Sequence, residues 1–395
     1  MKYNHVLSYD ELVKGRTMND NLNVFLKSDI KDKVQDMREL FSQNKIAFLF
    51  GAGCSKCAGL PLMGELTKEV LDHKSISNSS KKLLDNVLDL FSGACYATIE
   101  DYMSEIVDQL SIAERRNRRG AKQKKVFIKD LEIDATELQV VLDEIKQAVS
   151  FSIGNKQVNI ATHQQFIRVI HTSLQAGKGD RGVDYFILNY DTLIEDALGL
   201  ECVVYNDGFT GGATGWWQPD SFRYDGKATN VFKMHGSIDW CLLKDDSLPR
   251  RIRSGIKTEF IENHVLIYPA ATKYQETQRD PFAQMLYHLR TILCPCEGKE
   301  IVLVICGYSF GDSHINLEIF NALSKSDGRL TIAAFVETEE PEGELSYWMD
   351  NSKINDQIRV YTNKGFFHGY KIFKQKDDLP WWKFEILTRL LGGER

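Results

Sequence analysis

The residues of this chain that are able to do chemistry stand directly after apolar runs. Asn189 and Asp191 follow the run DYFIL, and His235 follows NVFKM. The unperturbed pKa of histidine is about 6.5, which suits a general base, and an asparagine carboxamide can orient a hydroxyl or a water. Simpler interpretations exist for all three, since Asp191 suits the N-cap of the following TLIEDAL helix, Asn189 a turn and His235 the end of a strand.

A loop of small residues follows the apolar run KIAFLF. Its candidate binding residues are Gly51, Ala52, Gly53 and Ser55. A backbone without Cβ atoms can lie against a diphosphate, and a helix N-terminus behind such a loop attracts negative charge. The usual dinucleotide pattern has its third glycine three residues after the second, whereas here it comes later, at Gly59. The standard dehydrogenase fingerprint is therefore absent, and G-x-G alone also makes ordinary turns.

The elements that must position these residues are short strands. KIAFLF, DYFIL, NVFKM and IVLVIC, the last followed by Gly307 and Ser309, are continuous apolar runs typical of strands buried on both faces. Helical patterns such as DTLIEDAL and DSHINLEIFNAL lie between them, and ECVVYND, HVLIYPA, LTIAAFVE and IRVY continue the strand series. The alternation predicts an α/β fold with a Rossmann-like, doubly wound parallel sheet. Ligands bind beyond the carboxyl ends of such strands, where these polar residues are predicted to meet.

The predicted organisation inserts helices into this sheet domain. We expect a helical N-terminal extension (1–43), a sheet domain in two pieces (44–74 and 181–365), a helical insertion (75–180) and a C-terminal segment (366–395). The aromatic residues of the C-terminal segment indicate either an intramolecular dock or a subunit interface.

The helical insertion contains a basic run, ERRNRRGAKQKK, in which seven of twelve residues are cationic. We interpret this run as a solvated loop between two helices. The alternative is contact with an acidic partner or a nucleic acid backbone.

Composition narrows the class of protein. The chain has 395 residues, 43% of them apolar and 26% charged, as in a globular protein. No apolar run approaches the roughly 20 residues of a membrane span, and the N-terminal residues lack the apolar core of a secretory signal, so we expect a cytoplasmic protein without membrane contact. The net charge of −6 argues against general attraction to nucleic acid.

The eight cysteines do not have the spacing of a metal site. Cys54 and Cys57 form one C-x-x-C, but the other close pair, Cys294 and Cys296, has a single residue between its members. A zinc ribbon needs two matched pairs, so we expect reduced thiols and no zinc.

Two further segments hold weaker candidates. NDGFTGGATGWWQPD, which includes Asp207, is either a lid or an irregular surface loop with Trp216 and Trp217 docked on the core. ATIEDYMSEI could bring Glu100 or Asp101 toward the pocket, but we interpret it as an exposed helix face.

Four motifs together resemble the sirtuin-like domain in its bacterial, non-deacylase branch. They are GAGCSKCAGLP, LNYDTLIEDAL, KMHGSIDW and CGYSFGDSHIN, within roughly residues 45–335. The resemblance implies an NAD-binding loop at Gly51, Ala52, Gly53 and Ser55, and further cofactor contacts from Asp191, Gly307 and Ser309. It also implies a catalytic pair, Asn189 and His235, with His235 as general base.

The departures from protein deacylases are informative. LPLMGEL stands where deacylases have an isoleucine-proline-aspartate-phenylalanine-arginine run, and the four-cysteine zinc ribbon is missing. The resemblance therefore implies an NAD hydrolase that cleaves the nicotinamide–ribose bond, as in bacterial antiphage effectors that deplete NAD. Such proteins form homo-oligomers, and some pair with a separate HerA-type P-loop ATPase. The alternatives are an NAD-dependent protein deacylase, and a non-catalytic NAD- or ADP-ribose-binding or nucleic-acid-processing partner of an ATPase.

Overall fold

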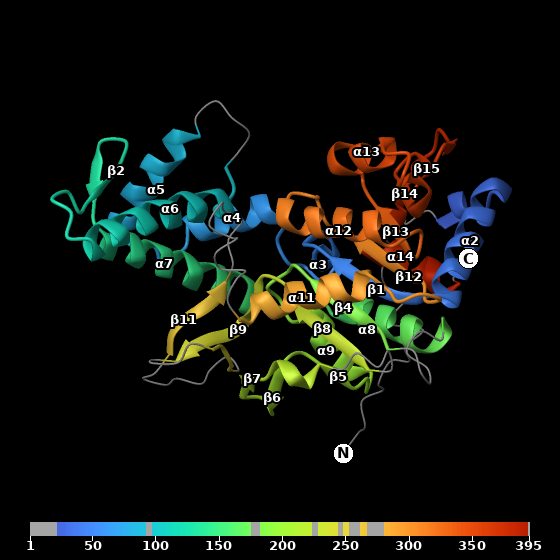
Figure 1. Ribbon diagram of the computed structural model, residues 1–395, viewed down its shortest axis with the longest axis horizontal. Coiled ribbons are helices and arrows are strands. Elements are labelled where there is room, and N and C mark those ends of the chain that lie inside the picture. Colours follow the sequence, from blue (N-terminus) through green and yellow to red (C-terminus); the bar gives the residue numbers. More distant parts are fainter. Residues whose placement is uncertain are drawn as a thin grey trace, which may run out of the picture.

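The structure is a computed structural model that describes residues 22–91, 97–174, 182–222, 228–243, 248–252, 261–266 and 280–393. It has a body built on a large sheet and a helical lobe beside it (Figure 1). Residues 1–21 of the expected N-terminal extension lie outside the described ranges, and residues 22–43 contain η1 and α2.

In the described part of the chain the body contains a nine-stranded sheet, in the order β16-β15-β14-β13-β12-β1-β4-β8-β5. Neighbours from β5 to β14 are parallel, and the hairpin β15–β16 is antiparallel. The predicted α/β fold with a Rossmann-like parallel sheet is confirmed. The strands are β1 (Lys45–Phe50), β4 (Asp184–Ile187), β5 (Tyr205–Asn206), β8 (Thr229–Lys233), β12 (Ile301–Cys306), β13 (Leu330–Phe335), β14 (Ile358–Thr362), β15 (Gly365–His368) and β16 (Lys371–Lys374).

A second sheet is antiparallel and has the order β11-β9-β10-β7-β6. Its strands are β6 (Phe209–Gly211), β7 (Gly215–Trp217), β9 (Gly236–Leu243), β10 (Arg250–Arg251) and β11 (Ile261–Leu266). The prediction that HVLIYPA continues the parallel series was wrong, because its described residues belong to β11, which pairs antiparallel with β9. A short apolar run does not encode which neighbour it will pair with.

Helices cover both faces of the large sheet, as alternate strand residues require. One face packs against η1 (Leu22–Leu26), α2 (Ser28–Gln43), α3 (Gly53–Lys56), α8 (Ala161–Arg168), the π-helical turn η2 (Val169–Ser173), α9 (Leu193–Leu200), η5 (Pro380–Trp382) and α14 (Phe384–Gly392). The other packs against α11 (Phe282–Leu293), α12 (Ser313–Lys325) and α13 (Gly343–Asp350). The short helix η4 (Asn355–Gln357) contacts β13 and α13, and η3 (Pro219–Ser221) contacts β6.

The C-terminal segment docks on its own chain. Trp381 is fully buried, and its indole Nε1 donates a hydrogen bond of 2.6 Å to the backbone oxygen of Thr362. Phe384 on α14 contacts Phe50 of β1 and Phe166 of α8 edge-on or tilted. Of the two interpretations of this segment, the structure has the intramolecular dock.

The helical lobe has a core of its own. It consists of α4 (Met63–Leu71), α5 (Asn78–Leu90), α6 (Ile99–Arg118), the hairpin of β2 (Val126–Ile128) and β3 (Leu131–Ile133), and α7 (Ala135–Gly154). Capping boxes start α6 at Thr98 and α7 at Asp134. The lobe's core extends to Tyr190 and Leu193, which lie beside the carboxyl end of β4. The helices that share this core begin with α4, which precedes the predicted start of the insertion at residue 75. The division of the chain with an insertion at 75–180 remains a prediction.

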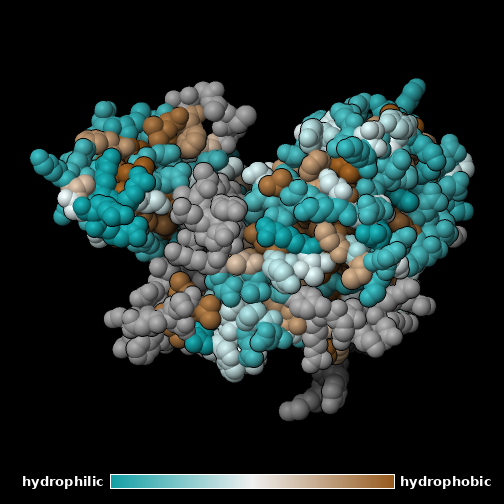
Figure 2. All heavy atoms as spheres, viewed as in Figure 1, coloured by the Kyte–Doolittle hydropathy of each residue, from teal (hydrophilic) through white to brown (hydrophobic). Residues whose placement is uncertain are grey.

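The basic run is only partly a loop. Its first residues complete α6 and its last precede β2, while the Arg116 guanidinium donates to the backbone oxygen of Lys125 at 2.5 Å. In the view of Figure 2 hydrophilic side chains cover most of the described surface of both lobes. Among the described helices none combines the length and the apolar character that a bilayer crossing requires.

Candidate functional site

Strand register aligns the ends of four neighbouring strands. Phe50, the last residue of β1, pairs with Ile187 of β4 on one side and with Cys306 of β12 on the other. Ile187 in turn pairs with Lys233 of β8. These four residues therefore form one row across the sheet, and the segments that follow them leave at the same edge.

The predicted site residues follow that row at equal offsets. Gly51 and Gly307 come one residue after it, and Asn189 and His235 come two residues after it. The hydrogen bond from Met234 N to Ile187 O, at 2.9 Å, continues the β4–β8 ladder beyond the strands. Asn189 and His235 thus leave adjacent parallel strands side by side.

The glycines are required by contact between two loops. A Cβ on Gly51 would lie 2.4 Å from the carbonyl oxygen of Gly307, and a Cβ on Gly53 would lie 2.7 Å from Gly307 Cα. Gly307 has φ of +66°, and its own Cβ would lie 2.4 Å from Cys54 N. The loop after β1 and the turn after β12 therefore pack backbone against backbone, which explains these three glycines without a ligand.

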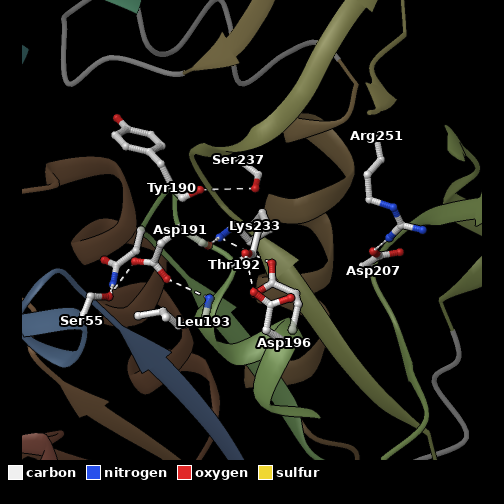
Figure 3. Close-up of polar contacts among 12 residues, drawn as sticks. Ser55, Tyr190, Asp191, Thr192, Leu193, Asp196, Asp207, Lys233, Ser237 and Arg251 are labelled. Atoms are coloured by element: carbon white, nitrogen blue, oxygen red, sulfur yellow. Dashed lines mark hydrogen bonds and ion pairs between the residues drawn. The ribbon is translucent and has the colours of Figure 1, made fainter. Parts of the chain in front are cut away.

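A hydrogen-bonded chain joins the loop after β1 to the turn after β4. Asn189 Nδ2 donates to Gly51 O at 3.0 Å and to Ser55 Oγ at 2.7 Å. Ser55 Oγ donates to Asp191 Oδ2 at 2.6 Å, and Leu193 N donates to Asp191 Oδ1 at 3.1 Å (Figure 3). Asp191 thus accepts from the first residue of α9 and from Ser55 at the same time, whereas the N-cap of α9 is Thr192 and not Asp191 as its simpler interpretation predicts.

His235 is buried in the turn between β8 and β9, with 4% of its surface exposed. Its Nε2 lies 4.0 Å from Asp312 Oδ1, and its ring centroid lies 5.6 Å from that of His314. Asp312 and His314 belong to the start of α12, after β12. Asp312 therefore places a carboxylate close to the imidazole ring of His235.

The helical lobe reaches this site through Glu100. Burial raises the pKa of Tyr190, and the negative charges of Glu100 and Asp312 raise it further. The Tyr190 hydroxyl hydrogen-bonds to the Glu100 carboxylate. Tyr308 is buried nearby, accepts from Asp312 N at 3.1 Å, and also has a raised pKa, mainly through burial. Placing Glu100 on an exposed helix face was wrong, because Glu100 is half-buried and its carboxylate contacts the buried Tyr190 hydroxyl.

A buried lysine is the functional candidate that the sequence interpretation missed. Lys233 is 1% exposed, its Nζ donates to the backbone oxygen of Asp191, and it lies 3.5 Å from Glu195 Oε1. Burial raises the pKa of Glu195 to about 7, although the Lys233 ammonium opposes that shift. The signal was in the sequence, since a lysine inside a strand buried on both faces requires a partner.

The remaining candidates lie elsewhere or make other contacts. Asp207 is buried in an ion pair with Arg251; burial raises its pKa and Arg251 lowers it (Figure 3). The segment 206–220 forms the hairpin β6–β7, with Trp217 in the core and Trp216 45% exposed. Ser309 is exposed in the turn after β12.

Of the two cysteines near the glycine loop, Cys54 is a buried thiol and Cys57 a half-buried one. Cys54 Sγ donates to Cys306 O at 3.1 Å, and burial raises the pKa of Cys54 well above its usual value. Burial also raises the pKa of Cys57, to about 12. Within the described ranges, histidine, cysteine and carboxylate side chains nowhere gather in threes around a possible metal position.

Comparison with known proteins agrees with this geometry. Residues 184–354 match the family model of the SIR2-like domain, a range that runs from the start of β4 to the residue before η4. It includes Asn189, His235, Gly307 and Ser309, whereas β1 and its glycine loop lie before it. No curated protein gives a significant match. Residues 184–354 are therefore similar to the SIR2-like domain.

Proposed function

We propose that this protein hydrolyses NAD at the nicotinamide–ribose bond, releasing nicotinamide and ADP-ribose. The observation that supports this most is the side-by-side exit of Asn189 and His235 from β4 and β8, next to the glycine loop. SIR2-like domains bind NAD, and the match covers both of these residues. A scaffold that only binds a nucleotide needs neither a buried imidazole nor an adjacent carboxamide.

The charges around His235 fit the cationic end of NAD. Asp312 lies 4.0 Å from the imidazole, and Glu100 and Asp312 both act on the buried Tyr190 hydroxyl. Carboxylates beside a cationic nicotinamide ring, and beside the oxocarbenium-like transition state that follows, lower the energy of both charges. The diphosphate would then lie over the loop of Gly51, Ala52, Gly53 and Ser55, toward the Gly307–Ser309 turn.

In the proposed reaction a water molecule replaces nicotinamide on the anomeric carbon. The C–N bond to nicotinamide breaks and its electron pair leaves with the neutral nicotinamide. A C–O bond forms from the water, and His235 accepts the proton that the water loses. Asn189 orients the water and the ribose, since its amide nitrogen is held by Gly51 and Ser55. A general base of this kind typically contributes about 100- to 10,000-fold.

The test is incubation of the purified full-length chain with NAD, followed by chromatography for nicotinamide and ADP-ribose. We expect both products without any peptide, and their loss in His235→Ala and Asn189→Ala with unchanged circular dichroism. His368→Ala is the matched control, because His368 pairs with Arg359 at the amino end of β14, away from the site. Full activity of both site variants would overturn the assignment.

The same assay separates the alternatives. A protein deacylase consumes NAD only when an acyl-lysine peptide is added, and a non-catalytic binder retains NAD without consuming it.

The biological role that we propose is that of a cytoplasmic antiphage effector, which depletes NAD as a homo-oligomer, with a separate HerA-type ATPase as partner. It rests on the resemblance of the four motifs. Expression with and without the partner, with NAD measured in infected cells, tests it. NAD that stays constant during infection in protected cells would contradict this role.

A further inference from the structure

Lys233 lies where an ammonium group is costly. It ends β8, whose five residues are all buried, and only 1% of its own surface is exposed. Removing a charge from water costs several kcal/mol, in order of magnitude, unless partners compensate it. A lysine at this position therefore indicates a specific need for its contacts.

The two contacts of Lys233 reach two different elements. Its Nζ donates to the backbone oxygen of Asp191 in the turn after β4, and it lies 3.5 Å from the Glu195 carboxylate on α9. The Glu195 side chain is only 13% exposed, so the pair is buried as a whole. Other negative groups near Glu195 are Asp239 and Asp191, which raise the pKa of Glu195, while Lys233 lowers it.

The hydrogen bond from Lys233 to Asp191 joins the turn that carries Asn189 to the end of the strand that precedes His235. Asp191 lies two residues after Asn189, and His235 lies two residues after Lys233. Asp191 is fixed in two further directions, since its carboxylate accepts from Ser55 and from Leu193 N. Lys233 makes a third contact with Asp191, at its backbone oxygen, from the end of β8, the strand that precedes His235 (Figure 3).

We propose, building on the proposed function, that Lys233 is a positioning residue that fixes Asn189 relative to His235 through the Asp191 carbonyl, with Glu195 as its charge partner. Lys233 does not touch the reacting atoms. It sets the distance between the group that orients the water and the group that accepts its proton. A displacement of about 1 Å between such groups can cost about 100-fold in rate.

The experiment compares Lys233→Met, Glu195→Gln and the double variant by urea unfolding and by NAD cleavage. Lys233→Met leaves a buried carboxylate without its cation, whereas the double variant removes both charges and regains stability. The inference expects the double variant to keep a kcat about 10- to 100-fold below wild type. It expects KM within about twofold, because substrate contacts are unchanged. Recovery of kcat together with stability would overturn the inference.

The matched control is a lysine–carboxylate pair at the amino ends of β1 and β4, at the edge of the sheet opposite to the site. Lys45 Nζ lies 2.8 Å from Asp184 Oδ2, and these residues begin β1 and β4. Lys45→Met with Asp184→Asn is expected to change stability but leave kcat unchanged. A loss of kcat in this control equal to that of the Lys233 variants would contradict a positioning role.

A readout that does not need turnover separates this inference from the proposed function. Hydrogen exchange at the backbone amides of residues 190–193 is expected to accelerate in the double variant, because the Asp191 carbonyl loses its tether. If wild-type protein does not cleave NAD, the proposed function fails while this measurement still stands. Unchanged exchange in the double variant would overturn the tether itself.

Discussion

At the scale of residues, the site depends on close approach and on shared hydrogen bonds. The three glycines at the ends of β1 and β12 lie so close together that no Cβ fits between them. Ser55 links the Asn189 amide to the Asp191 carboxylate, and its hydroxyl is used once as acceptor and once as donor. Small residues therefore set the geometry around Asn189 and His235, the two residues proposed to be catalytic.

Gly307→Ala is expected to destabilise the protein by about 3 kcal/mol or more, because left-handed strain adds to a backbone clash. Gly328→Ala is the control. Gly328 has φ of +81°, but no atom lies within 4 Å of its Cβ position. Strain alone should cost about 1 kcal/mol there. Urea unfolding of both variants measures the difference, and equal losses would show that the loop contact is not tight.

Ser55→Ala should cost about 1.5–3 kcal/mol, because the buried Asp191 carboxylate loses a charge-assisted hydrogen bond. Ser324→Ala is the control, since its exposed hydroxyl donates only to Phe320 O within its own helix. That variant should stay within about 0.5 kcal/mol of wild type. Thermal and urea unfolding check both values. A Ser55→Ala variant as stable as Ser324→Ala would contradict the linking role of this hydroxyl.

At the scale of elements, the sequence predicts strand ends better than strand partners. The continuous apolar runs gave β1, β4, β8 and β12, and parallel topology then placed their polar ends together. Register, which sequence patterns do not contain, was needed to find that Lys233 reaches the Asp191 carbonyl. The same limit explains why β11 was assigned to the wrong sheet, since an apolar run of strand length fits either sheet. It also explains the error at Glu100, because the contact of Glu100 with Tyr190 depends on tertiary packing.

The η5–α14 element should behave as part of the core. Trp381→Ala is expected to cost about 3–5 kcal/mol, the usual range for a buried tryptophan. Trp381→Phe keeps ring contacts with Tyr361 and Phe25 but leaves the Thr362 carbonyl without its donor. That variant should lose about 1–3 kcal/mol. Unfolding free energies distinguish the two, and a neutral Trp381→Ala would contradict the intramolecular dock.

At the scale of the whole molecule, buried histidines couple stability to pH. Burial lowers the pKa of His171 and of His288 to about 4, from 6.5. Unfolding exposes both rings, which then bind protons more readily than in the folded state. Their contribution to stability is present above pH 6.5 and is lost as the pH falls toward 4. Glu195 acts with the opposite sign, because its raised pKa favours the folded state at low pH and that contribution is lost toward pH 7.

His288→Leu should therefore flatten the pH dependence of unfolding. Between pH 7.5 and 5, wild type is expected to lose about 2 kcal/mol through this ring alone, and the variant should not show that loss. For each protein, the comparison uses the difference in the free energy of unfolding between the two pH values. The absolute stability of the variant therefore does not affect the result. Parallel pH profiles would mean that His288 is already protonated in the folded state at pH 5.

The position of β1 has a consequence for how this protein can be dissected. The SIR2-like match begins at residue 184, yet β1 lies between β4 and β12 and pairs with both of them. A fragment trimmed to residues 184–354 would lack β1, which lies in the middle of the sheet. The edges of β4 and β12 that pair with β1 would then have unpaired backbone hydrogen-bonding groups. Expressed alone, such a fragment is expected to aggregate, because it also lacks α2, α8 and α14, which cover one face of the sheet.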